Sequence, residues 1–85
     1  MKFRFLSLEL PFEKQNHECC KAMYEIFPQG TQISSLRPTL LVTFSEFQSL
    51  TQLDTFISEL ETALELNAEF QHMDTYCQTC TLIMR

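Results

Sequence analysis

Two short stretches of the sequence combine histidine with cysteine. "HECC" and "HMDTYCQTC" contain six such residues, His17, Cys19, Cys20, His72, Cys77 and Cys80. Structural zinc takes four nitrogen or sulfur ligands in a tetrahedron. A Cys-x-x-Cys turn can supply two of them, from Cys77 and Cys80. His17 and Cys20, three residues apart on a helix, can share one face and supply the other two.

This zinc pattern is incomplete, because the chain has a single Cys-x-x-Cys where two would be diagnostic. In an extended strand, Cys77 and Cys80 would also point to opposite faces.

A redox role needs a thiol pKa lowered by a cation or a helix N-terminus, and this segment is poor in basic residues. We therefore expect buried apolar thiols and no cofactor. The alternative is a zinc-stabilised or thiol-based regulatory domain using Cys77, Cys80, Cys20 and His17.

The second chemical feature is an acidic half. The net charge is −5. Residues 1–37 contain five Lys and Arg against four acids, whereas residues 38–84 contain seven acids and no Lys or Arg. Binding to nucleic-acid phosphates needs clustered Lys and Arg, so direct nucleic-acid binding is not expected.

Within this half, "ISELETALELNAEF" predicts a helix that carries acids without partners. Asp54, Glu61 and Glu65 fall on one edge of its apolar stripe, with Glu69 beyond, whereas Glu59 lies on the far side. One interpretation is a solvated face that keeps the protein soluble. The other is an interaction surface for a basic protein, which complementary potentials would attract.

These features favour a small, non-enzymatic protein-interaction module that binds a basic protein surface through Asp54, Glu61, Glu65 and Glu69. Small acidic proteins that inhibit nucleic-acid-binding proteins are similar to this chain in size and charge. An enzyme is not expected, because the single glycine, Gly30, excludes a Gly-rich phosphate loop and no catalytic motif has a recognisable setting.

The length and composition predict a single α+β domain spanning residues 1–85. Apolar residues make up 45% of the chain, including eight Phe, which is enough for a core. No apolar run approaches the roughly 18 residues of a membrane span. The N-terminus "MKFRFLSLEL" alternates polar and apolar residues, unlike a signal peptide. We therefore expect a cytoplasmic protein without membrane association.

Five segments show recognisable patterns. Residues 2–10 predict a strand whose apolar residues change parity around Leu6, which indicates either burial on both faces or a bulge there. Residues 13–27 predict a helix, and residues 39–44, "TLLVTF", a strand. Ser49 and Gln52 form a capping box that opens a helix from about 50 to 66. Residues 69–85 favour either one long strand or a hairpin breaking near Asp74.

Two amphipathic helices that each bury one face require a sheet to cover, which predicts a two-layer sandwich with both helices on one face of a three- or four-stranded sheet. If residues 31–36 form a strand, the order is ferredoxin-like, βαββαβ. If residues 69–85 form a hairpin instead, the order is βαβαββ, which resembles the small sulfur-carrier fold in topology.

Self-association through an exposed sheet edge such as "FRFLSL" is a third functional alternative.

Overall fold

The structure is a computed structural model, and it describes residues 2–36 and 39–85. In these ranges the chain forms five strands, two α-helices and one short 3-10 helix. In chain order they are β1 (Lys2–Glu9), η1 (Phe12–Lys14), α1 (His17–Ile26), β2 (Gln32–Leu36), β3 (Thr39–Ser49), α2 (Leu50–Leu64), β4 (Ala68–Asp74) and β5 (Thr79–Met84).

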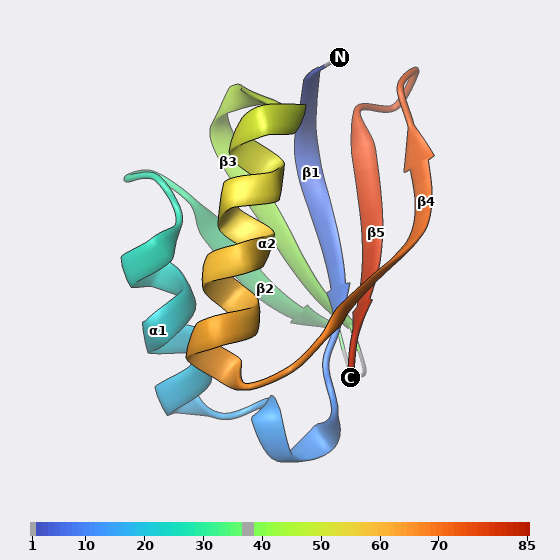
Figure 1. Cartoon of the computed structure of the whole chain (residues 1–85). Coiled ribbons are helices and arrows are strands. Elements are labelled where there is room, and N and C mark those ends of the chain that lie inside the picture. Colours follow the sequence, from blue (N-terminus) through green and yellow to red (C-terminus); the bar gives the residue numbers. More distant parts are fainter. Residues whose placement is uncertain (1, 37–38) are drawn as a thin grey trace.

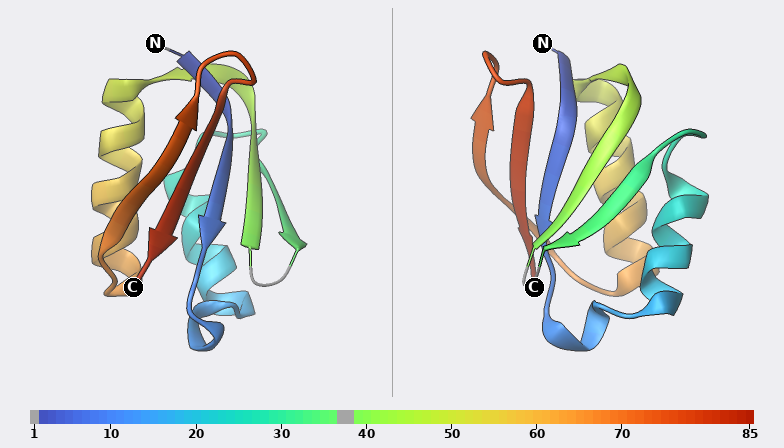
Figure 2. Two further views of the ribbon diagram at one scale, coloured as in Figure 1. Left: turned by 90° about the vertical axis from the view of Figure 1, so that its right-hand side faces the viewer. Right: turned by 180° about the vertical axis from the view of Figure 1, so that it is seen from behind.

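The strands form one mixed sheet in the order β2-β3-β1-β5-β4. The central strand β1 runs antiparallel to β3 and parallel to β5, and β4 closes a hairpin with β5. Both α-helices lie on the same face of this sheet (Figure 1), and the views from the side and from behind show the other face without a helix (Figure 2). The predicted two-layer α+β sandwich is therefore confirmed.

The predicted number of strands is wrong, because the sheet has five strands rather than three or four. One predicted order included a strand at 31–36, and the other included a C-terminal hairpin. The structure has both, which gives βαββαββ. The ferredoxin-like order is not confirmed, since β5 lies between β1 and β4. Short β-favouring segments rich in Ser and Thr give too little periodicity to separate strand from loop.

The central position of β1 also corrects the self-association hypothesis. The segment "FRFLSL" was proposed as an exposed edge, but β1 pairs on both sides, with β3 and with β5. The edges are instead β2 and β4. Because both ladders of β1 satisfy its backbone groups, this segment offers no free edge to a second copy.

The core lies between the helices and the sheet. Four phenylalanines form its centre, Phe3, Phe27, Phe44 and Phe56, and their ring centroids are 5.4–5.8 Å apart. Three of the four contacts are edge-to-face, a favoured aromatic geometry. The predicted apolar stripe of α2 is buried from Leu53 to Leu64, whereas Leu50 is exposed.

A bulge in β1 explains the change of parity near Leu6. The backbone N–H groups of Arg4 and Phe5 both donate to the Gln78 carbonyl, at 2.9 and 3.1 Å. Two residues of β1 therefore face Gln78, the residue before β5, which shifts the phase of β1 by one residue. Phe3 and Leu6 can then both be buried.

The helix boundaries follow their caps. The first predicted helix is split, since η1 ends at Lys14 and α1 begins at His17. Asn16 caps α1, because its side chain accepts a hydrogen bond from the Cys19 N–H. The predicted capping box of Ser49 and Gln52 is confirmed at the start of α2. Side-chain oxygens at these positions satisfy N–H groups that have no partner within the helix.

Tyr24 protects the β2 edge, because its hydroxyl oxygen accepts a hydrogen bond from the Ile33 N–H at 3.0 Å. We expect Tyr24→Phe to keep the fold and lower the free energy of unfolding by about 1 kcal/mol, through loss of one hydrogen bond. Amide exchange at Ile33 should become faster. Tyr76→Phe is the control, since Tyr76 is 95% exposed in the β4–β5 turn. Unchanged exchange at Ile33 in the Tyr24 variant would contradict this assignment.

Candidate protein-docking surface

The acidic edge of α2 contacts strand β4 at its C-terminal end. This contact is made by Glu61, whose carboxylate Oε2 accepts a hydrogen bond from the Ala68 N–H at 3.0 Å, at the start of β4. Asp54 and Glu65 follow the same edge, because residues seven and four positions away return to nearly the same side of a helix. Both are exposed. The structure therefore places Asp54 and Glu61 on one edge of α2, roughly 10 Å apart along the helix axis, and Glu65 at its C-terminal cap.

Glu61 also stabilises the fold, which the sequence did not indicate. Its side chain is half-buried, and its backbone carbonyl accepts the N–H of Leu66 at 3.2 Å. Together with the bond from Ala68, these contacts hold the turn between α2 and β4. Charge reversal at Glu61 would therefore weaken the turn as well as change the surface charge.

Glu69 lies apart from the other three carboxylates. It is in register with Ile83 of β5, on the face of the sheet opposite the buried Leu82 and the helices. Its Oε2 lies 3.8 Å from Arg85 Nε, and both side chains are exposed. An ion pair this exposed contributes little to stability, but it neutralises the charge of Glu69. We therefore leave Glu69 out of the candidate surface.

Phe70 adds an exposed aromatic ring beside the acidic edge. Ala68, Phe70 and Met73 are in register with the buried Met84, Leu82 and Cys80, so they lie on the helix-facing side of β4. Ala68 and Met73 pack against the core, whereas Phe70 is 50% exposed. We define the α2–β4 flank as Asp54, Glu61, Glu65 and Phe70. The sequence marked Phe70 only as β-favouring, because its exposure depends on β4 being an edge strand.

Glu65 adopts an unusual backbone conformation. Its φ and ψ are 56° and 44°, in the left-handed region, at the C-terminal end of α2. Helices often end with such a residue, but it is usually Gly or Asn. A side chain with a Cβ costs roughly 1–2 kcal/mol in this region. The negative end of the helix dipole also disfavours a carboxylate there.

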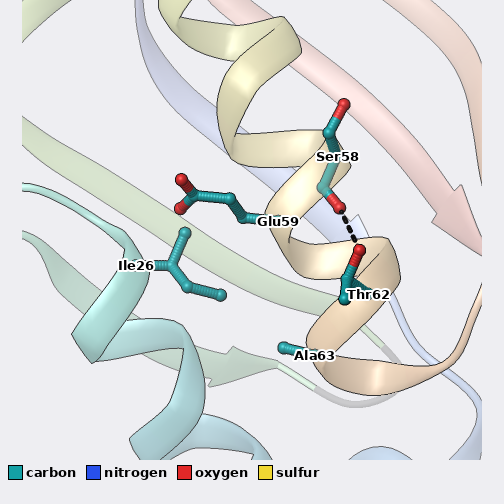
Figure 3. A pocket seen from close by; sticks show the side chains of 5 residues that line it. All are labelled: Ile26, Ser58, Glu59, Thr62 and Ala63. Atoms are coloured by element: carbon teal, nitrogen blue, oxygen red, sulfur yellow. Dashed lines mark hydrogen bonds between the residues drawn. The ribbon is translucent and has the colours of Figure 1, made fainter.

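A groove runs between α1 and α2, from the outer surface of α2 toward Ile26. It has a volume of about 440 Å³ and is lined by Ile26, Ser58, Glu59, Thr62 and Ala63. Figure 3 shows Ile26 and Ala63 facing each other across the groove, with Glu59 above them. The sequence placed Glu59 on the far side of the helix from Asp54, as found here. The groove itself could not be predicted, because it depends on the spacing of the two helices.

The cysteines lie in different environments. Cys80 is fully buried in β5, and burial raises the pKa of its thiol to about 11. Cys77 is exposed in the β4–β5 turn, where its hydrogen bond with the Asp74 carboxylate raises the pKa of the Cys77 thiol. Cys19 and Cys20 are half-buried on α1. Zinc binds cysteine as the thiolate, so a metal bound at this pair would displace the protons of both thiols.

Asp74 organises the same turn through its other hydrogen bonds. Its Oδ1 accepts the N–H groups of Tyr76 and Cys77, at 2.9 and 3.1 Å. The bond from the Cys77 N–H is the main cause of the lowered pKa of Asp74. Across residues 2–36 and 39–85, no three His, Cys, Asp or Glu side chains gather as a metal site. The geometry thus uses Asp74 and Cys77 as turn residues.

Comparisons with protein-family models, curated proteins and solved structures find no match for this chain. No helix in the described part of the chain has the length and apolar character needed to cross a bilayer.

The two cysteines of the Cys-x-x-Cys pair separate a packing role from a metal role. We expect Cys80→Ala to lower the free energy of unfolding by about 1 kcal/mol, because it removes one buried atom. Cys77→Ala should change it little, and a chelator should leave the thermal unfolding temperature unchanged. Unfolding of both variants, together with sensitivity to chelator, would establish the zinc alternative in place of the packing role.

Proposed function

We propose that this protein is a non-enzymatic interaction module that binds a basic protein surface through the α2–β4 flank. Asp54 and Glu65 supply exposed charge, Glu61 holds the turn, and Phe70 supplies an apolar centre. The partner class includes nucleic-acid-binding proteins, whose phosphate-binding groove the flank would occupy as an inhibitor. The proposed setting is the cytoplasm, where thiols stay reduced.

The conformation of Glu65 is the observation that carries this proposal. Three local preferences act against a glutamate there: the left-handed backbone, the helix dipole and the like charge of Glu61 four residues earlier. Strained positions cluster at functional sites. A role in binding would explain why an acid stands where Gly or Asn would fold better.

Phe70 supports a protein partner over a small ion. Exposed carboxylates alone contribute little to affinity, because water screens each ion pair. Stable interfaces surround a desolvated aromatic or arginine centre with polar groups. Phe70 fits this arrangement, because it is half-exposed and lies two residues after Ala68, whose N–H donates to the Glu61 carboxylate. An arginine or lysine of the partner could also lie over the ring, in a cation–π contact.

Charge reversal tests the flank directly. We expect the double variant Asp54→Lys/Glu65→Lys to bind a short oligolysine peptide roughly tenfold more weakly than the native chain at low salt. The native affinity should fall steeply between about 20 and 200 mM NaCl, because the charges are exposed. Nuclear magnetic resonance titration measures both effects and maps the contact, which should include Phe70.

The matched control is Glu13→Lys/Glu46→Lys, which makes the same change in net charge at exposed positions outside α2 and β4. If both double variants lose affinity equally, net charge alone governs binding and the proposed flank is wrong. Circular dichroism of each variant separates loss of binding from loss of fold.

Glu65→Gly should separate stability from binding. We expect this substitution to raise the free energy of unfolding by about 1 kcal/mol, because glycine adopts the left-handed conformation without strain. The same variant should bind oligolysine more weakly, because it removes one carboxylate. Urea unfolding and the titration give the two readouts. A glycine variant that unfolds more easily than the native chain would contradict the strain assigned to Glu65.

A further inference from the structure

We propose that the groove between α1 and α2 binds an amphipathic helix of a partner protein, with leucine-sized residues on one face and lysine or arginine beside them. The groove is lined by Ile26, Ser58, Glu59, Thr62 and Ala63. Ile26, Glu59 and Ala63 lie toward α1, whereas Ser58 and Thr62 adjoin the α2–β4 flank on the surface of α2. The proposal rests on the lining of the groove and not on the flank, and its test separates the two sites.

The groove is suited to apolar side chains. Ile26 and Ala63 face it from the two helices (Figure 3). The hydroxyl of Thr62 donates a hydrogen bond to the Ser58 carbonyl at 3.1 Å, so this hydroxyl already has a partner within α2. The groove has a volume of about 440 Å³, and it is open to solvent, because the four lining residues of α2 are all exposed. A partner can therefore lay apolar side chains along it from outside.

The walls favour a helix over an extended segment. An added strand needs unpaired backbone N–H and C=O groups along its binding site. Both walls here are α-helices, whose backbone groups bond within each helix. A partner helix satisfies its own backbone and presents only side chains, so it can lie in the groove without leaving polar groups unpaired.

The charges around the groove favour a basic helix over a second copy of this chain. Glu59 stands at its rim and is exposed. From Leu50 to Leu64, α2 contains no Lys or Arg, and α1 contains two acids, Glu18 and Glu25, against one base, Lys21. A second copy would bring either of these acidic helices against Glu59, which like-charge repulsion opposes. Lysine or arginine flanking the apolar face would instead pair with it.

Two synthetic peptides test this proposal. One is an amphipathic lysine–leucine helix, and the other carries alanine in place of every leucine. We expect the leucine peptide to shift the methyl resonances of Ile26 and Ala63 and to bind at least roughly tenfold more tightly than the alanine peptide, because it buries more apolar surface. Equal affinities, or shifts confined to other residues, would overturn the proposal.

Two protein variants complete the test. Ala63→Lys places bulk and positive charge in the groove, whereas Thr55→Lys makes the same charge change at an exposed position of α2 outside it. Lysine is a good helix former, so both variants should fold. Ala63→Lys should weaken binding of the leucine peptide roughly tenfold, and Thr55→Lys much less. Equal losses would overturn the groove.

The readouts also separate this site from the α2–β4 flank. If the leucine peptide loses affinity only in Asp54→Lys/Glu65→Lys, the flank is the site and the groove proposal fails. If only Ala63→Lys loses affinity for it, the groove stands without the flank.

Discussion

The burial of the apolar stripe of α2 against the central strands is the packing constraint on which the rest of the structure depends. Phe56 in this stripe contacts the rings of Phe27 and Phe44, which joins α1, α2 and β3 in one core. Once that face is buried, the remaining directions around the helix are fixed. One edge, with Glu61, must face β4, and the other, with Glu59 and Ala63, must face α1. Both candidate surfaces are consequences of this single orientation.

Local signals in the sequence were sufficient for the elements that begin with a cap or repeat regularly. The capping box of Ser49 and Gln52 placed the start of α2, and the alternation from Thr39 to Phe44 placed most of β3. The strand order was not predictable in this way. The insertion of β5 between β1 and β4 depends on pairing between residues more than 70 positions apart, such as Phe5 with Thr79, and no local pattern encodes such a pairing.

In the candidate site, too, the residues of one helix were predictable from the sequence, and those placed by strand register were not. A helical wheel was enough to group Asp54, Glu61 and Glu65, because all three belong to one helix and its turn. Glu69 and Phe70 follow that helix in β4, and their faces depend on the register with Ile83 and Leu82. The register turns the charge of Glu69 away from the flank and leaves the Phe70 ring beside it. An aromatic residue therefore enters the site from a segment that showed only β propensity.

The placement of glycine strengthens the case for Glu65. The chain has one glycine, Gly30, whose φ is 90° and where an added Cβ would lie 2.9 Å from Ser45 Oγ. Both the backbone and the close approach require glycine there. Two other described residues have a positive φ, Glu65 and Gln78. The carbonyl of Gln78 accepts the N–H groups of Arg4 and Phe5, whereas Glu65 ends a helix and carries a carboxylate. Elsewhere, Asn16 and Ser49 occupy the cap positions that favour them. At Glu65 the left-handed backbone, the helix dipole and the like charge of Glu61 all act against a glutamate, and this combination supports the proposed role of Glu65 in binding.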